Sequence, residues 1–164
     1  MESYRVETNR LILRPFSIQD AEEYFRMTRD KEIQTFVPYA CPASYAECLD
    51  DISNIYSKGD FAYDYYVLIE EKSSHTIIGA IICVLVHDFD TSFFIRKEYR
   101  HHGYMQEALK AFIANMKKGG ALQFDVSNEN KFSLQTLASI KGIEEIQYAG
   151  GSDESDVHHF ILVL

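Results

Sequence analysis

The stretch TSFFIRKEYRHHGYMQEALKAFIANM, residues 91–116, decides the fold. Its first part, Ser92 to Ile95, is short and apolar, which predicts a strand. A charged turn follows and reaches Gly103. Beyond it, apolar residues recur at steps of three and four, which predicts an amphipathic helix: Met105, Ala108, Leu109, Phe112, Ile113 and Met116. A strand that enters a helix through a basic, glycine-containing turn directs several backbone N–H groups at one point, so the turn is suited to hold an anion.

Strand and helix signals precede this stretch. Residues 10–15 predict a first strand, which Pro15 ends. Ser17 predicts the cap of a helix that ends near Asp30, and Ser44 that of a second helix, which stops at Gly59. Three more strands, joined by short polar links, are expected at residues 65–71, 75–86 and 91–95. Gly79, inside the long middle strand, predicts a bulge or a close approach of two backbones.

The rest of the chain continues the alternation of strands and helices. We expect strands at residues 122–126, 143–149 and 157–164, and a helix at residues 131–140. The order of elements predicts an α+β fold with a mixed, mostly antiparallel central sheet of about seven strands, flanked by about four helices. The antiparallel strands should turn parallel at the crossover helix of the opening stretch.

Composition limits the classes of function. The chain has 164 residues, 46% hydrophobic and 25% charged, as expected of one ordinary globular domain. A net charge of -9 argues against nucleic-acid binding and is compatible with a cationic partner such as an amine, although acidity also aids solubility. The three cysteines form no C-x-x-C pair, so we expect reduced thiols in a cytoplasmic protein. We expect no membrane association, because the longest apolar run, residues 77–86, is too short to span a bilayer.

Two histidine pairs invite a metal interpretation, which the spacing opposes. They are His101–His102 and His158–His159. Adjacent residues point to opposite faces of a strand, and no third ligand is spaced to join either pair. We therefore expect no metal, with the first pair at the anion turn and the second on the last strand, one residue on each face.

Four pieces of sequence, in order, carry a family resemblance. They are TNRLILRPF at residues 8–16 with Asp20–Ala21 after it, Ile78–Gly79, IRKEYRHHGYMQEAL at residues 95–109, and Asn130-Lys131-Phe132-Ser133. Together they resemble the GNAT N-acetyltransferase superfamily, in the branch of ribosomal-protein N-terminal (alanine/serine) acetyltransferases, over nearly the whole chain.

The resemblance implies an acetyl-CoA-dependent N-acetyltransferase, one domain over residues 1–164, with its sheet splayed at the cofactor slot. A primary amine, either a protein N-terminus or a small molecule, would attack the thioester directly through a tetrahedral intermediate. No nucleic acid is implied as a partner, and both a monomer and a homodimer stay open. The alternative is a catalytically weak CoA-binding regulatory or interaction module.

The resemblance also implies roles for individual residues. Backbone N–H groups of the turn would hold the pyrophosphate of CoA, and the strand before it would bond the pantetheine arm. The N–H near Ile95 would stabilise the oxyanion, and Ser133 near the sulfur is the candidate acid. Asn130 would contact the pantetheine or a bound water. The expected cofactor-binding residues are Phe93, Phe94, Ile95, Arg100, His101, His102, Gly103, Tyr104, Met105, Gln106, Asn130 and Ser133.

The acid and the base of the reaction are less well defined. Many superfamily members place a tyrosine acid seven residues after the asparagine, where this chain has Leu137. Ser133 or water must then protonate the thiolate, or no acid is needed. The general base is a water chain or one of five carboxylates: Glu70, Glu71, Asp88, Asp90 and Asp125. Glu107 is expected to support the helix start electrostatically. The aromatic run at residues 61–66 could wall an acceptor groove or pack within a strand.

Overall fold

An eight-stranded sheet forms the centre of the protein in a computed structural model, which describes residues 4–57, 65–85, 89–116, 120–146 and 156–164. Its strands follow the order β1-β2-β3-β4-β5-β6-β8-β7, and every neighbouring pair is antiparallel except β5 with β6. They are β1 (Val6–Glu7), β2 (Leu11–Pro15), β3 (Tyr65–Glu71), β4 (Thr76–Leu85), β5 (Phe89–Ile95), β6 (Ala121–Ser127), β7 (Glu144–Ile146) and β8 (Val157–Val163).

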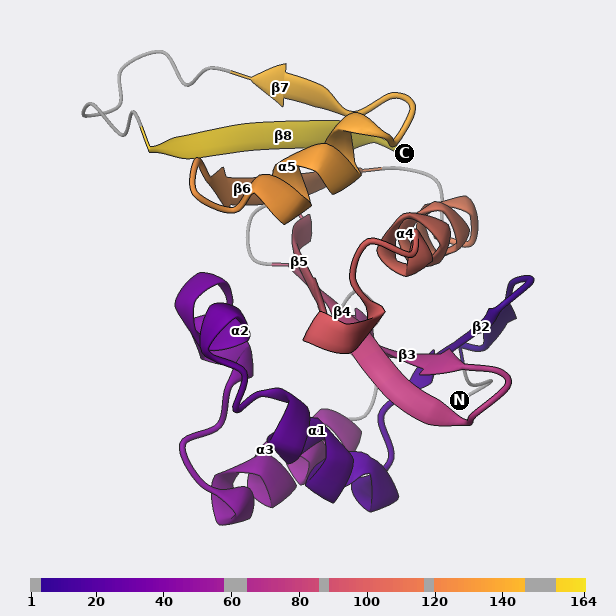
Figure 1. Cartoon of the computed structure of the whole chain (residues 1–164), viewed down its shortest axis with the longest axis vertical. Helices are drawn as coiled ribbons and strands as arrows, with labels where there is room; N and C mark the ends of the chain where they lie inside the picture. Colours follow the sequence, from indigo (N-terminus) through magenta and orange to yellow (C-terminus); the bar gives the residue numbers. More distant parts are fainter. Residues whose placement is uncertain (1–3, 58–64, 86–88, 117–119, 147–155) are drawn as a thin grey trace.

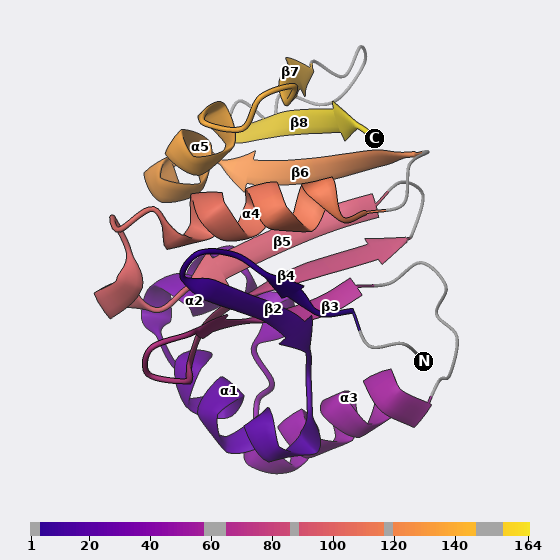
Figure 2. The ribbon, with the colours of Figure 1, turned by 90° about the vertical axis from the view of Figure 1, so that its right-hand side faces the viewer.

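Helices cover both faces of this sheet, because its strands are apolar on both sides. One face carries α1 (Ala21–Met27), α2 (Lys31–Phe36) and α3 (Tyr45–Ser57) (Figure 1). The other carries α4 (Tyr104–Ala114) and α5 (Lys131–Ala138), and Figure 2 looks onto that face. Short 3-10 turns are η1 (Ile18–Asp20), η2 (Pro38–Ala40) and η3 (Lys97–Tyr99). Among the described residues, no helix has the length and apolar character needed to cross a membrane.

The predicted fold class is confirmed, and two short elements were missed. The strand β1 has two residues and raises the strand count above the expected seven. The helix expected from Ser17 to near Asp30 is present as η1 and α1, and a further helix that was not expected, α2, begins directly after Asp30. It begins there because Asp30 has an extended backbone and its carboxylate accepts the N–H groups of Glu32 and Ile33, which caps a new helix.

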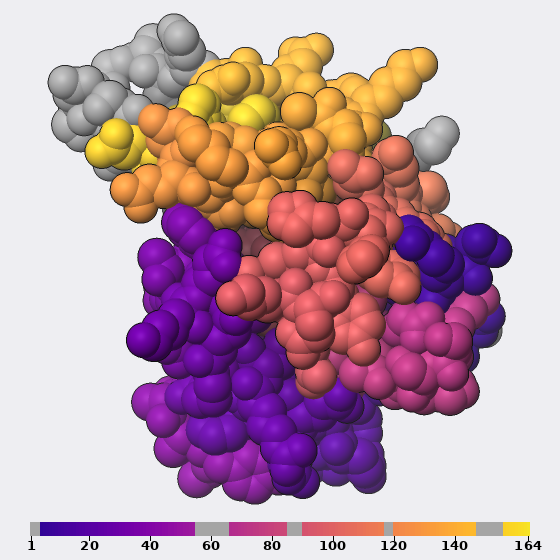
Figure 3. Space-filling view, viewed as in Figure 1, coloured from indigo at the N-terminus to yellow at the C-terminus, as the bar shows by residue number. Residues whose placement is uncertain are grey.

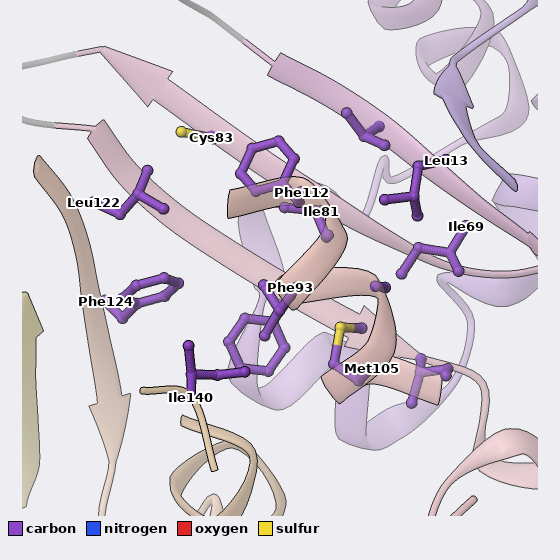
Figure 4. Close-up of a cluster of buried hydrophobic side chains, with 14 of the residues drawn as sticks. Leu13, Ile69, Ile81, Cys83, Phe93, Met105, Phe112, Leu122, Phe124 and Ile140 are labelled. Atoms are coloured by element: carbon purple, nitrogen blue, oxygen red, sulfur yellow. The ribbon is translucent and has the colours of Figure 1, made fainter. Parts of the chain in front are cut away.

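Other boundaries shift by a few residues. The strand expected at residues 143–149 is described as β7, which is shorter, and residues 147–149 lie outside the described part of the chain. The expected helix stop at Gly59 also lies outside it. The helix of the opening stretch is confirmed, since Met105, Ala108, Leu109, Phe112 and Met116 are buried against the sheet (Figure 4).

Gly79 occupies a bulge and a close backbone approach, as its position in the long strand predicts. Ile69 of β3 pairs with Gly79 and Glu70 pairs with Ile77, so Ile78 is an extra residue in β4. A Cβ atom at Gly79 would lie 2.4 Å from the carbonyl oxygen of Phe94 in β5. Glycine therefore lets β4 and β5 approach closely just before β5 enters the turn that leads to α4.

The parallel pair β5–β6 opens along its length. In the described part of the chain it comprises two residue pairs near the start of both strands, Phe89 with Leu122 and Asp90 with Gln123. Beyond them the strands diverge, while the rings of Phe93 and Phe124 meet edge to face on the α4 side, with centroids 6.2 Å apart (Figure 4). The splay expected from the sequence is thus present at the predicted pair of strands.

Candidate active site

The turn before α4 presents unbonded backbone N–H groups. His101 and Gly103 both have a positive φ, 63° and 75°, which curls the chain tightly into the helix. Gly103 is the N-cap of α4 and, as a glycine, has no side chain that could accept a capping hydrogen bond. Within the described residues, no backbone carbonyl accepts the N–H groups of residues 103–106, whereas Glu107 N–H bonds to Gly103. These groups and the helix dipole make the turn an anion site.

Arg10 joins this turn and was not among the residues expected there. Its Nε bonds Glu107 at 2.7 Å and its Nη1 bonds the carbonyl of His102 at 2.9 Å. Its guanidinium also lies 4.2 Å from the ring centroid of Tyr104. The cation therefore lies beside the anion turn. Only the pairing of distant segments reveals this, since 97 residues separate Arg10 from Glu107.

Glu107 anchors the start of α4 to the N-terminal strands. It accepts hydrogen bonds from the Thr8 hydroxyl and from the N–H and Nε of Arg10. Burial opposes ionisation of this carboxylate, but the bonds from Thr8 and Arg10 outweigh it and hold the pKa of Glu107 below its usual value. The expected support of the helix start thus acts through a specific ion pair.

Backbone groups of β5 face the opening between β5 and β6. Arg96 N–H bonds the carbonyl of Ile78 in β4. Antiparallel strands alternate between bonded and non-bonded pairs, so the N–H groups of Phe93 and Ile95 point away from β4 and toward β6. Because β6 has diverged there, the described residues offer these two N–H groups no strand partner. They are donors lined up along one edge of a slot.

A shallow, open cleft lies at this opening. Figure 3 shows the surface hollowed where α2, the turn before α4 and the α5 region meet. Its lining comes from both faces of the sheet, since the strands no longer touch: Glu32, Ile33, Phe36, Val37, Phe93, Phe94, Ile95, Arg100, Asn130, Phe132 and Ser133. Helix α2, which the sequence did not predict, supplies one wall. The cleft therefore lies where β5 and β6 diverge, and residues from both faces of the sheet border it.

Arg100 lines the cleft and makes contacts that its predicted role did not include. It pairs with Glu32 and, at 3.4 Å, with Asp30, both at the start of α2. Its Nε donates to the carbonyl of Ile95 at 3.1 Å. The guanidinium therefore ties α2 to the end of β5 across the mouth of the cleft.

Asn130 and Ser133 lie at the start of α5, as the N-x-x-S pattern predicts. The Asn130 side chain accepts the N–H of Ser133 at 3.1 Å and so caps the helix. Ser133 is 94% buried and lines the cleft, where its hydroxyl has no hydrogen-bond partner among the described residues. Leu137 is fully buried in the core, so its position supplies no acid to the cleft.

The structure describes four of the five candidate bases, and two of these four are engaged in contacts elsewhere. Glu70 is committed to Arg14 at 2.6 Å and to His75, and Glu71 accepts bonds from Ser73 and Ser74 in a turn, so neither is available near the slot. Asp88 lies outside the described residues. Asp90 and Asp125 remain, on the two strands that diverge. Partial burial, and then the charge of Asp125, raise the pKa of Asp90.

The histidine pairs lie as the sequence predicts. His101 and His102 are exposed at the anion turn. On β8, His158 bonds Glu145 at 2.6 Å and His159 bonds Asp125 at 2.8 Å, on opposite faces. No group of three or more His, Cys, Asp or Glu side chains suited to hold a metal occurs in the described part of the chain. In the run at residues 61–66, only Tyr65 and Tyr66 are described, and both belong to β3.

Known proteins share this fold. A sequence model of the acetyltransferase (GNAT) domain matches residues 10–141. A GNAT-family acetyltransferase from Bacillus anthracis has a similar structure, with a TM-score of 0.74, 15% identity, and 97% of this chain and 98% of that chain covered. For the ribosomal-protein-S5-alanine acetyltransferase from Vibrio fischeri the values are 0.70, 16%, 97% and 96%.

A third similar structure is a ribosomal L7/L12 alpha-N-protein acetyltransferase in complex with coenzyme A. Its TM-score is 0.78 and its identity 12%, with 98% of each chain covered. No protein of curated function matches this chain in sequence.

Proposed function

Because this chain belongs to the GNAT acetyltransferase family, we propose that it moves an acetyl group from acetyl-CoA to a primary amine by direct attack. The family expected from the four motifs is confirmed, and with it an acetyl-CoA-dependent N-acetyltransferase. The acceptor is an amine on a protein N-terminus or on a small molecule. We also propose that residues 1–164 form one acetyltransferase domain.

The single observation that carries the proposal is the slot between β5 and β6. A pantetheine arm is an extended chain with amide groups, and the slot edge offers it the N–H groups of Phe93 and Ile95. The pyrophosphate has the N–H groups of residues 103–106 at the far end of the same strand, with Arg10 beside them. Donor edge, anion turn and cleft are thus arranged in the order that the parts of CoA require.

Bound acetyl-CoA would supply an activated carbonyl whose leaving group is a thiolate. The residues of this chain would hold the arm, stabilise the oxyanion and protonate the thiolate. A bound arm would run from the turn at Gly103 back along β5, with its thiol end toward Phe93 and the point where β5 and β6 meet. The N–H of Ile95, our first candidate, and that of Phe93 face the slot and can stabilise the oxyanion. Ser133 offers its hydroxyl to the thiolate.

Arg100 has a different role in the proposal from the one that the sequence suggested. Its Nε holds the carbonyl of Ile95 and its other nitrogens hold α2. We propose that this residue fixes α2 as a wall of the slot. Arg10 joins the residues proposed to meet the pyrophosphate.

A thiol-release assay tests the proposal. The purified chain is incubated with acetyl-CoA and a panel of primary amines, including peptides that begin with Ala or Ser. We expect free CoA to appear with at least one amine, together with an acetylated product of the expected mass. Calorimetric titration with CoA measures binding in parallel.

The alternative, a catalytically weak CoA-binding module, is favoured by one observation. The position at which many superfamily members carry a tyrosine acid is Leu137, buried in the core. A CoA thiol is acidic enough, with a reference pKa of about 8.5, that a leaving thiolate needs little help, so we prefer the enzyme. Binding of CoA without release of thiol, for every amine in the panel, would support the module and overturn the proposed reaction.

A further inference from the structure

A polar cluster lies where β5 and β6 begin to diverge, on the face that carries α2. Asp90 and Ser92 of β5 and Asp125 of β6 share this face, because Phe94, two residues further along β5, packs with the α2 side of the core. Asp125 pairs with His159 of β8, so that side chain joins the cluster. Tyr39 of η2 completes it, with its hydroxyl in contact with that of Ser92.

The register places this cluster at the narrow end of the slot. Asp90 is opposite Gln123 in the last parallel pair, so Ser92 and Asp125 are the next residues on that face of the two strands as they separate. Their neighbours Phe93 and Phe124 close the other face with an edge-to-face ring contact. The cluster of Tyr39, Asp90, Asp125 and His159 therefore borders the narrow end of the slot on the face opposite this ring contact.

His159 is held in one orientation by Asp125. Its Nδ1 lies 2.8 Å from Oδ1 of Asp125. A carboxylate accepts and does not donate, so Nδ1 carries a proton in this contact, and the neutral form of the imidazole has its lone pair on Nε2. The imidazole side chain is about four-fifths buried, with 19% exposed, while Asp125 is half-exposed. A fixed imidazole with an accepting Nε2, beside two carboxylates, is suited to attract a cationic amine and to take its proton.

We propose that His159 is the general base of the reaction, that Asp125 positions it, and that Asp90 and Asp125 draw a cationic primary amine to this end of the slot. The inference rests on the proposed function and names its substrate class. The net charge of the chain, -9, agrees with a cationic acceptor. The direction of the pKa shift of Tyr39 agrees with the proposal as well. Burial of its hydroxyl, and then the charges of Asp90 and Asp125, raise the pKa of Tyr39, although much of its ring is exposed.

The proton balance is complete without another reactant. His159 Nε2 takes one proton from the ammonium group, which leaves a neutral amine and an imidazolium. The amine lone pair then forms the N–C bond at the thioester carbonyl, and the C–S bond breaks with its electron pair on sulfur. The second amine proton goes to the thiolate, so the products are the amide, CoA thiol and a protonated His159, which returns its proton to water.

The experiment compares two histidines on one strand. His159→Gln removes the proposed base, and His158→Gln is the matched control, since His158 also bonds a carboxylate, Glu145, but on the opposite face. Both variants are assayed with acetyl-CoA and the most active amine of the panel, from pH 6 to about pH 9.5, a range that spans the ordinary α-amine pKa of about 7.7–8.0. Thermal unfolding and CoA titration verify that each variant folds and binds the cofactor.

We expect His159→Gln to lower kcat/KM by about a hundredfold at pH 7. The loss should shrink as the pH rises, because more of the amine is then neutral in solution, while His158→Gln leaves the profile unchanged. Asp125→Asn should reduce kcat in the same direction, and Asp90→Asn should raise KM for the amine. In the described part of the chain, the titratable groups on the same face as His159 include Tyr39, Asp90, Asp125 and Glu144 of β7, two residues before the partner of His159 in that strand.

The outcomes separate this inference from the proposed function. If the unmodified chain releases thiol and His159→Gln has an unchanged kcat/KM and pH profile, His159 is not the base and the inference is wrong. If the unmodified chain binds CoA and acetylates no amine, the proposed function fails and the inference falls with it. Equal losses in the His158 and His159 variants, with normal CoA binding, would also overturn it, since a common loss reflects the strand and not the cluster.

Discussion

A methyl group at Gly79 would test whether the slot depends on the approach of β4 and β5. In Gly79→Ala the new Cβ would lie 2.4 Å from the carbonyl oxygen of Phe94 and 3.2 Å from Cα of Ile95. Carbon–oxygen contacts are ordinarily at least about 3.3 Å, so the strands must separate there by about 0.9 Å. Both neighbours are backbone atoms and cannot rotate aside. The strain therefore moves the segment whose N–H groups face the slot.

Two magnitudes follow from this displacement. Overpacking of this kind costs about 1–3 kcal/mol of stability, and in a domain of this size each kcal/mol lowers Tm by about 2–4 °C. Two hydrogen bonds to the pantetheine arm, each worth about 1 kcal/mol, would also be weakened. Partial loss of both corresponds to roughly tenfold weaker CoA binding, since 1.4 kcal/mol is a factor of ten.

Thermal unfolding and calorimetric titration with CoA measure the two effects, and Gly142→Ala is the control. Gly142 has a φ of 90°, and its added Cβ would meet Leu162 at 3.3 Å. The left-handed backbone alone should cost about 1–2 kcal/mol. Gly142 lies beyond the end of α5, so CoA affinity should be unchanged. An unaltered Tm and CoA affinity in Gly79→Ala would refute the reasoning. Equal loss of affinity in both variants would show that binding merely follows global stability.

Three other predictions concern the ends of the slot. Gly103→Glu should weaken CoA binding about a thousandfold, because a unit charge about 4 Å from the pyrophosphate costs about 4 kcal/mol. The control is Gly103→Ala, which introduces only backbone strain. Retained affinity in the Glu variant would mean that the pyrophosphate binds elsewhere. Glu107→Gln should cost about 1–3 kcal/mol in urea unfolding at pH 7. Because the folded-state pKa of Glu107 is depressed, the stabilisation is lost as the pH falls through that value, so the variant and the parent should converge in acid, and a constant difference at all pH values would contradict this. Ser133→Ala should lower kcat about a hundredfold with CoA affinity unchanged if its hydroxyl protonates the thiolate, and an unchanged kcat would assign that proton to water.

Periodic and capped segments were predictable from the sequence. The apolar stripe that begins at Met105 identifies α4, because burial of a helical face requires that spacing whatever the helix packs against. Gly103 before it and the N-x-x-S pattern at Asn130 place the anion turn and the start of α5, since both are local backbone requirements. Gly79 marks its bulge for the same reason.

Short elements escaped prediction. The helix α2 has six residues and the strand β1 has two, too few for either to show a period. Asp30 does carry a signal for α2, because an aspartate before a Lys-Glu-Ile run is a good cap, but the same residue also suits the end of the preceding helix, which is what the sequence predicts. The miss matters, because α2 forms one wall of the cleft.

By itself the sequence determined the local conformations of this protein: which segments are helices and strands, where the anion turn lies, and which motifs imply a CoA slot. Only the tertiary structure decided which distant side chains meet. It brought Arg10 to Glu107, closed Arg100 onto α2, and paired Asp125 with His159, which is 34 residues away. Local backbone preference is written in neighbouring residues, whereas these contacts depend on strand order and register.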